Sequence, residues 1–138
     1  MAYAPTNDSD DFLKDEFYQF LEQTVQSINP TDVIVCLGDF NAVTSTVRDG
    51  FKRVMGPFDS GTPNDNSARL LDFCLGADLR VAGSWFERHD IHRFSWYSYD
   101  GQTAKEIDHV LVNTHWKVIQ NYPVYRSMEF DSDHRPLV

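Results

Sequence analysis

The pattern of apolar and polar residues along the chain predicts two helices. Acidic residues at positions 8, 10 and 11 favour a helix start, and Asn29-Pro30 favours an end. A second helix is predicted to begin at Asn66, which would cap it, and to end near Gly76. In the first helix, over residues 10–28, six side chains recur at helical spacing and would form one buried face: Leu13, Phe17, Phe20, Leu21, Thr24 and Ile28.

Short strand-like segments surround these helices. Residues 32–37 are apolar at both alternating positions, which predicts a central strand that is covered on both faces. The glycine- and proline-rich stretch 44–65 predicts a long loop, and the mixture of elements predicts an α/β (α+β) architecture. Further strands are predicted over 79–84, 94–99, 106–112 and 118–126 and from Asp133 onward, with Asp100-Gly101 as a turn.

Composition restricts the class of protein. The chain has 138 residues, which favours one domain, and its net charge of −9 argues against tight, non-specific binding of nucleic acid by the whole surface. It does not exclude a catalytic encounter in which a metal ion offsets phosphate charge. The longest apolar run, 33–37, is too short to span a membrane, and the first residues lack a secretory signal. Two cysteines cannot form a disulfide scaffold, so an intracellular protein with reduced thiols is expected.

Three polar segments carry residue types suited to chemistry. Asp39 and Asn41 follow a strand directly, Asp108 lies inside a strand pattern, and Asp133-His134 precedes a strand. Carboxylates accept protons or hold hard cations, and histidine acts as an acid, a base or a hydrogen-bond donor. Each segment also has a structural reading: an Asx turn at Asp39, an edge-strand or arginine-paired Asp108, and a solvated turn at Asp133-His134.

Taken in order, these segments resemble the endonuclease/exonuclease/phosphatase superfamily. The resemblance covers essentially the whole chain, and it implies a four-layered α/β sandwich in which two mostly antiparallel sheets pack between helices. The segments Ala68–Cys74 and Phe94-Ser95-Trp96 are similar to the branch of apurinic-type endonucleases of non-LTR retrotransposons that includes the craniofacial development protein 2-like sequences. The superfamily motifs are Tyr3-Ala4-Pro5, Gly38-Asp39-Phe40-Asn41, the segment 107–112 with Asp108, and Ser132-Asp133-His134.

The resemblance implies catalytic roles for four of these residues. Asp39 and Asn41 would handle the attacking water and the phosphate. His134 would contact the scissile phosphate, and Asp108 would orient His134. The implied reaction is metal-dependent phosphodiester hydrolysis.

The resemblance also implies a cofactor and a substrate. Asp133 would lie at a site for Mg²⁺ or Mn²⁺, and Tyr3, like Asn41, would lie near the phosphate. The retroelement branch implies DNA as the partner of a complete domain. The same chemistry also serves RNA or a phosphoinositide, so the motifs leave the substrate open.

The superfamily pattern further predicts that residues 1–138 form the C-terminal portion of one domain. The early asparagine and the metal-binding glutamate of the family have no counterpart here, and residue 138 falls inside the expected last strand. Half of a two-sheet sandwich would leave a sheet face or edge uncovered, so pairing with a missing N-terminal half or self-association is expected. A catalytically inactive fragment is therefore the alternative to a DNA endonuclease.

Overall fold

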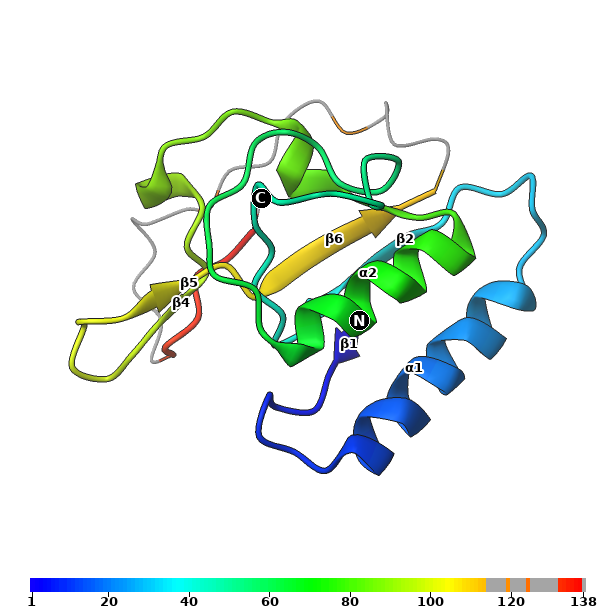
Figure 1. Ribbon diagram of the computed structural model, residues 1–138, viewed down its shortest axis with the longest axis horizontal. Coiled ribbons are helices and arrows are strands. Elements are labelled where there is room, and N and C mark those ends of the chain that lie inside the picture. The colour runs from blue at the N-terminus through cyan, green and yellow to red at the C-terminus, as the bar shows by residue number, and fades with distance from the viewer. Residues whose placement is uncertain (114–118, 120–123, 125–131, 138) are drawn as a thin grey trace.

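The computed structural model describes residues 1–113, 119, 124 and 132–137. A four-stranded sheet has the order β1-β2-β6-β3, and β4 and β5 form a separate hairpin (Figure 1). The predicted α/β class is confirmed. The elements are β1 (Ala2–Tyr3), α1 (Asp11–Gln26), β2 (Val35–Asp39), α2 (Asp65–Ala77), β3 (Arg80–Val81), β4 (Trp96–Tyr97), β5 (Ala104–Lys105) and β6 (Asp108–Val112), with 3-10 turns at Ala82–Trp85 and Asp90–His92.

The two helices and one face of the four-stranded sheet enclose the main core. Tyr18 and Leu21 of α1 meet Phe73 and Cys74 of α2, and Leu111 of β6 closes the cluster from the sheet. Burial of large apolar side chains is the main force that holds these layers together. Neither helix in the described part of the chain combines the length and the apolar character that crossing a bilayer requires.

The buried face of α1 differs from the predicted one. Leu13 and Phe20 are exposed, whereas Lys14, Tyr18 and Leu21 are buried. Lys14 explains why the helix is rotated about its axis from the predicted orientation. Its Nζ points inward and donates to the carbonyl of Asn7 at 2.6 Å and to the Asp65 carboxylate at 3.0 Å. The acidic start of the helix is confirmed, since the side chain of Asp10 caps it.

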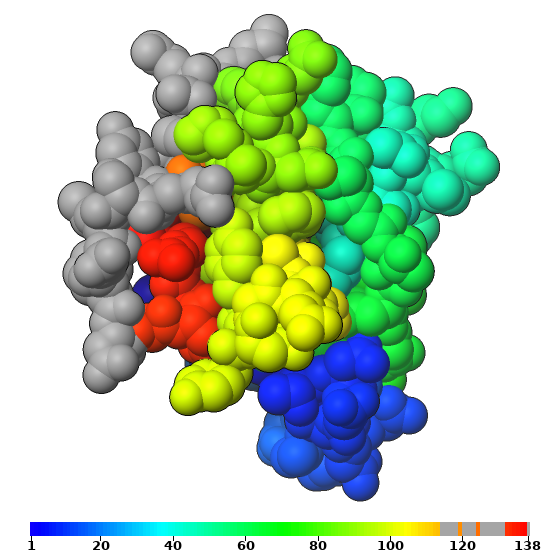
Figure 2. Space-filling model, turned by 90° about the vertical axis from the view of Figure 1, so that its left-hand side faces the viewer, coloured from blue at the N-terminus to red at the C-terminus, as the bar shows by residue number. Residues whose placement is uncertain are grey.

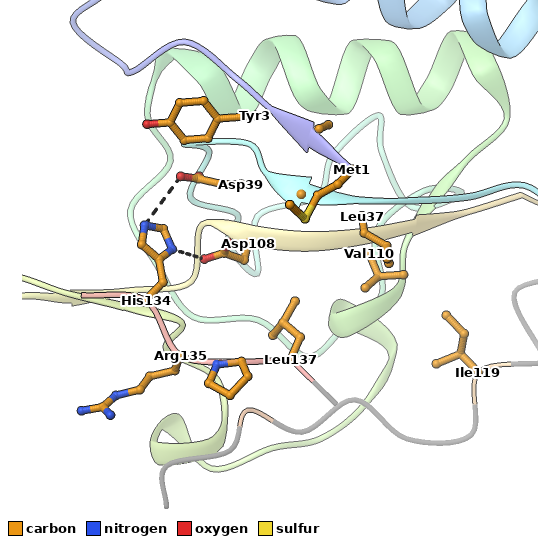
Figure 3. Close-up of a pocket in the computed structure, with 13 residues that line it drawn as sticks. Met1, Tyr3, Leu37, Asp39, Asp108, Val110, Ile119, His134, Arg135 and Leu137 are labelled. Atoms are coloured by element: carbon orange, nitrogen blue, oxygen red, sulfur yellow. Dashed lines mark hydrogen bonds and ion pairs between the residues drawn. The ribbon is translucent and has the colours of Figure 1, made fainter. Parts of the chain in front are cut away.

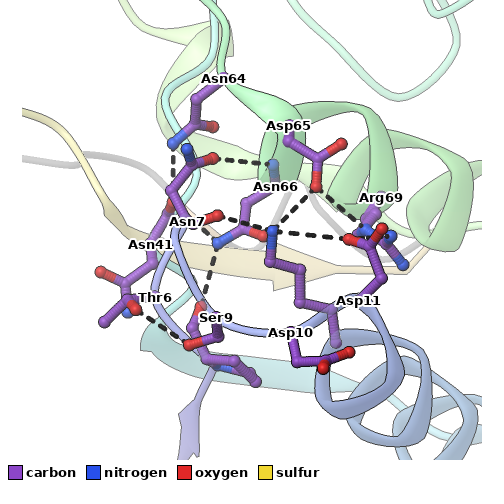
Figure 4. Close-up of polar contacts among 12 residues, drawn as sticks. Thr6, Asn7, Ser9, Asp10, Asp11, Asn41, Asn64, Asp65, Asn66 and Arg69 are labelled. Atoms are coloured by element: carbon purple, nitrogen blue, oxygen red, sulfur yellow. Dashed lines mark hydrogen bonds and ion pairs between the residues drawn. The ribbon is translucent and has the colours of Figure 1, made fainter.

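The helix α2 begins two residues earlier than predicted. Its N-cap is Asn64, whose side chain accepts from the Ser67 N–H while the Ser67 hydroxyl accepts from the Asn64 N–H. Asn66 is therefore not the cap. Its buried side chain instead donates to the carbonyl groups of Pro5 and Asn41, which ties α2 to the loops beside the sheet (Figure 4).

The prediction that the strand at 32–37 is covered on both faces is wrong. Cys36 packs on the helix side of the sheet, but Val35 and Leu37 are 49% and 47% exposed on the other side. On that side, Val110 and Val112 form a smaller cluster with Ala82. Ile119 and Leu137 pack against this smaller cluster, so among the described residues this face is buried at Val110 and Val112 and open at Val35 and Leu37.

The remaining strand predictions hold in part. The segment 79–84 is a strand only over Arg80–Val81, because Ser84 turns inward and its hydroxyl accepts the Gly56 N–H. The turn at Asp100-Gly101 is confirmed, and Gly101 has a positive φ of 69°. The loop at 44–65 is confirmed up to Asn64. Most of the predicted strand 118–126 lies outside the described residues, and of the predicted last strand the described part shows isolated bridges at His134 and Leu137.

Candidate active site

Strand register places two acidic side chains next to each other at one end of the four-stranded sheet. In the antiparallel pair β2–β6, Asp39 lies opposite Asp108, and in the parallel pair β1–β2, Tyr3 lies opposite Asp39. Alternate residues of a strand point to the same face. Both carboxylates therefore share the face that carries Leu37 and Val110, away from the helices.

His134 joins these carboxylates from a segment far along the chain. Its backbone forms an antiparallel bridge with Trp96, and residues 132–137 lie beside the β4–β5 hairpin on the surface (Figure 2). His134 Nδ1 lies 2.9 Å from Asp108 Oδ2, and Nε2 lies 3.7 Å from Asp39 Oδ2 (Figure 3). Because an ionised carboxylate only accepts hydrogen bonds, this contact assigns a proton to Nδ1 and turns Nε2 toward Asp39.

A cavity of about 720 Å³ opens directly beside the three side chains. Asp39, Asp108 and His134 line its polar end, while residues such as Leu37 and Leu137 line its apolar part (Figure 3). His134 is about one third exposed, whereas the two carboxylates are more deeply placed. A ligand in this cavity would therefore reach all three polar groups from one side.

Asp39 has the properties of a proton acceptor. Burial raises the pKa of its carboxyl, the N–H of Asn41 opposes that rise, the nearby Asp108 adds to it, and His134 opposes it. A carboxylate with a raised pKa is a stronger base than an ordinary aspartate. Asp39 therefore suits the removal of a proton from water better than a solvated carboxylate would.

Asn41 lies two residues after Asp39 and shapes the loop that leaves the strand. It adopts a left-handed conformation with φ 48°, and its N–H donates to Asp39 Oδ1 at 2.8 Å. Its side-chain amide donates to the carbonyl of Ala4 at 2.9 Å, and its own carbonyl accepts from Asn64 (Figure 4). The Asp39–Asn41 contact matches the Asx turn of the structural reading. That reading leaves the approach of Asp39 Oδ2 to His134 unexplained.

The structure separates Asp133 from the other acidic residues. Its Oδ2 accepts from Trp96 Nε1 at 2.8 Å, and its carbonyl accepts from the Tyr97 N–H at 3.0 Å. The side chain thus fixes the segment that carries His134, and its role as a metal ligand stays a prediction. Tyr3 lines the cavity next to Asp39, as the resemblance implies for a residue near the phosphate (Figure 3).

Three side chains have ligand atoms placed to share a metal ion. One ligand atom each of Asp39, Asp108 and His134 lies within 4.8 Å of the other two. Carboxylate oxygens suit Mg²⁺ and Mn²⁺, and an imidazole nitrogen is a more frequent ligand of transition metals. The ligand atoms therefore fit a divalent ion bound by the carboxylates. His134 would lie beside the ion, because its Nδ1 is hydrogen-bonded to Asp108.

A buried charge network lies directly before β6. Arg88 Nη2 contacts Glu106 Oε1 at 2.7 Å, and Arg93 Nη1 lies 3.4 Å from Asp59 Oδ1 and 3.7 Å from Glu106 Oε2. All four side chains are 5% exposed or less. Glu106 precedes Asp108 by two residues, so the network anchors the start of the strand that presents Asp108.

Comparison with solved structures supports an endonuclease-type fold. The endonuclease domain of TRAS1, a telomere-specific non-LTR retrotransposon, matches with a TM-score of 0.64 and 13% sequence identity, and the match covers 99% of this chain and 53% of that one. The chain therefore has an endonuclease-like α/β fold.

Curated relatives give the more specific likeness. The chain is 26% identical over 138 residues to craniofacial development protein 2 from Tragulus javanicus and, to the same extent, to that from Bos taurus. The matches cover 99% of this chain but 24% and 23% of the relatives, so the chain spans about a quarter of their length. No family model matches the chain. The resemblance inferred from the sequence motifs is confirmed by these comparisons.

Sequence reasoning missed two residues that build the site. The sequence analysis named Ser95 and Trp96 only in a motif of the family resemblance and gave them no role in the site. In the structure, the Ser95 hydroxyl accepts from the Asp108 N–H and Trp96 Nε1 donates to the Asp133 carboxylate. The available signal was a serine within an otherwise aromatic strand, Phe94-Ser95-Trp96, where a small polar side chain has to satisfy buried backbone groups.

Proposed function

We propose that this chain carries the catalytic residues of a metal-dependent phosphodiesterase site that acts on DNA. The observation that carries the proposal is the convergence of Asp39, Asp108 and His134, from three separate segments, at one end of a cavity. A pair of proton-transfer groups with an orienting carboxylate is typical of hydrolytic sites. The TRAS1 domain supports the choice of an endonuclease, since its fold is similar.

Each side chain has a role that follows from its contacts. Asp39 accepts a proton from the attacking water, because its carboxylate is both a raised-pKa base and turned toward the cavity. His134 donates from its ring to a phosphoryl oxygen as negative charge grows there. Asp108 keeps the ring in the required tautomer and stabilises its protonated form through the 2.9 Å contact.

Asn41 and Tyr3 complete the proposed surface for the phosphate. Asn41 fixes Asp39 through its N–H, and we assign its remaining side-chain N–H to a phosphoryl oxygen. Tyr3 stands next to Asp39 on β1 and presents a phenol to the same space. Both assignments follow the roles that the superfamily resemblance implies.

We propose Mg²⁺, or Mn²⁺ in its place, as the cofactor. Asp108 would provide an oxygen ligand, Asp133 would join it only after leaving Trp96, and Asp39 would lie beside the ion and accept the proton. When bound, the ion would supply positive charge that offsets the phosphate and the net charge of −9 on the chain. This supports a catalytic encounter with DNA rather than storage or coating of DNA.

A plasmid-nicking assay on the 138-residue chain tests the proposal. Supercoiled plasmid, with and without abasic sites, is incubated with the protein in Mg²⁺, in Mn²⁺ or in a chelator. We expect metal-dependent nicking that is abolished by His134→Ala and preserved in His89→Ala, a matched histidine change at an exposed residue. Calorimetric titration with Mg²⁺ measures the metal site separately.

The alternative of an inactive domain predicts the opposite pattern. Nicking that is absent, or equal in the wild type and His134→Ala, rejects catalysis by this site. Cleavage of an RNA or a phosphoinositide substrate in place of plasmid, with the same His134 dependence, keeps the chemistry and rejects DNA as the substrate.

A further inference from the structure

Ser95 is fully buried at the junction between the β4–β5 hairpin and the sheet. Its exposed fraction is 0%, and its Oγ accepts from the N–H groups of Ile107 and Asp108 at 3.3 and 3.2 Å. Its backbone carbonyl accepts from the N–H of Arg135 at 2.6 Å. One residue therefore contacts the backbone of Asp108 on one side and the backbone next to His134 on the other.

The path of the chain explains why a hydroxyl is needed there. The chain leaves β5 at Lys105 and enters β6 at Asp108, and this transition carries buried N–H groups that require an acceptor. An aliphatic side chain would leave them without the serine oxygen, and an unsatisfied buried donor is unfavourable. The serine oxygen thus fixes the backbone of Asp108 at the start of β6.

The second contact defines the position of the histidine. The Ser95 carbonyl and the Trp96–His134 bridge hold the segment 133–135 against the hairpin. Any movement of Ser95 therefore changes the separation between the Asp108 carboxylate and the His134 ring. Interactions that orient reacting groups are sensitive to displacements of this kind.

We infer that Ser95 is a positioning residue that sets the Asp108–His134 hydrogen bond. The inference rests on the proposed function for its kinetic consequences, but its structural part stands on the hydrogen bond itself. Ser95 contacts neither the cavity nor a reacting atom, so it acts through the two segments that it joins.

The test compares two buried serines. Ser95→Ala removes the hydroxyl that accepts from the Ile107 and Asp108 N–H groups and keeps the backbone carbonyl that accepts from Arg135. Ser84→Ala removes a similarly buried hydroxyl that contacts Gly56 and Val81 instead. The readout is the ring N–H resonance of His134 in ¹⁵N-histidine NMR spectra, assigned by its loss in His134→Gln. We expect the resonance to disappear in Ser95→Ala, to persist in Ser84→Ala and to persist in Ser95→Thr, which retains the hydroxyl.

Kinetics provide the second readout. Loss of a group that orients a catalytic side chain typically lowers activity about 10- to 100-fold, so kcat for nicking should fall by this factor in Ser95→Ala with little change in KM. Ser84→Ala should stay near the wild-type rate.

The possible results separate this inference from the proposed function. A retained His134 resonance in Ser95→Ala, or its equal loss in Ser84→Ala, overturns the positioning role. If the wild-type chain does not nick DNA but the resonance follows Ser95, the proposed function fails and the positioning role stands. If Ser95→Ala does not fold, Ser95→Cys takes its place, since a thiol fills the space but is a weak acceptor.

Discussion

Replacement of Asp108 by asparagine isolates the hydrogen bond on which the proposed chemistry depends. Asp108→Asn keeps the size of the side chain but removes its charge. The amide either donates toward His134 Nδ1 or accepts from it as a neutral group, so the ring loses the partner that fixes its tautomer and supports its protonated form. We expect the fold to persist and the catalytic rate to collapse.

The structure allows the loss to be estimated. The contact joins Nδ1 and Oδ2 at 2.9 Å, and the Asp108 side chain is 19% exposed, so solvent screens it only partly. A hydrogen bond to a charged group contributes about 1.5–3 kcal/mol, which corresponds to about 10- to 150-fold in rate. A histidine held in the wrong tautomer costs up to about 10⁴-fold in a comparable carboxylate–imidazole pair. We therefore expect kcat to fall by at least about 100-fold.

Single-turnover nicking of supercoiled plasmid in saturating Mg²⁺ measures this rate without a contribution from product release. Asp72→Asn is the matched control, because that aspartate is exposed on α2 and lies outside the three-residue cluster. A rate for Asp108→Asn within threefold of the wild type, in a preparation where His134→Ala is inactive, would refute the orienting role. A loss in Asp133→Asn as large as in Asp108→Asn would instead indicate that Asp133 reaches the metal.

Further changes test other parts of the structure. Asn41→Ala removes the proposed phosphate donor and the contact to Ala4, so kcat should fall about 10²–10³-fold in the nicking assay, and an unchanged rate would contradict the assignment. Burial raises the pKa of Asp39, so on acidification activity should begin to fall at a pH above the ordinary pKa of an aspartate. Asp108→Asn removes a nearby negative charge, so the NMR titration of the Asp39 carboxyl should shift to lower pH in that variant. Because the pKa of Asp39 is raised in the folded state, its ionised carboxylate lowers the free energy of unfolding at neutral pH, and this destabilisation is lost as pH falls through the folded-state pKa. Asp39→Asn should therefore melt no lower than the wild type at pH 7. A large drop in Tm would contradict the direction of this pKa shift. Glu106→Gln removes the buried carboxylate that contacts Arg88 and lies 3.7 Å from Arg93, so it should cost about 3–5 kcal/mol in urea unfolding. A loss under about 1 kcal/mol would show that the network is dispensable. We predict self-association through the exposed side chains of Val35 and Leu37, so Leu37→Lys, which places a charge there, should reduce the association measured by sedimentation. An unchanged profile would contradict this prediction.

The parts of the fold that could be predicted from sequence are those controlled by local pattern. Asp10 at the start of α1 and Gly101 in the hairpin turn have side-chain or backbone properties that act within a few residues. The face of α1 could not be predicted in this way, because Lys14 turns inward to reach Asp65, which is distant in sequence. Tertiary hydrogen bonds of this kind override the apolar periodicity of a single helix.

The candidate site shows the same division. The residue types of Asp39, Asp108 and His134 indicated the chemistry, and the superfamily resemblance indicated that they meet. Their roles remain proposals, whereas their proximity is a property of the structure. The contact of Asp133 with Trp96 and the two contacts of Ser95 depend on how the hairpin docks on the sheet, and no spacing within the sequence encodes that docking.

The alternation of β2 and β6 explains why an acidic site and an apolar face occur together. Because Leu37 pairs with Val110 and Asp39 with Asp108 in one register, the same face is apolar along the strands and acidic at their common end. A slip of one residue in either strand would turn the carboxylate of that strand toward the helix core, where an unpaired charge is very unfavourable, so the apolar residues of this face also fix the register of the two aspartates. His134 then needs only one further restraint, its pairing with the hairpin, to complete the cluster. It follows that changes on the apolar face that preserve alternation should leave the carboxylate pair intact, while an insertion between Leu37 and Asp39 should abolish it.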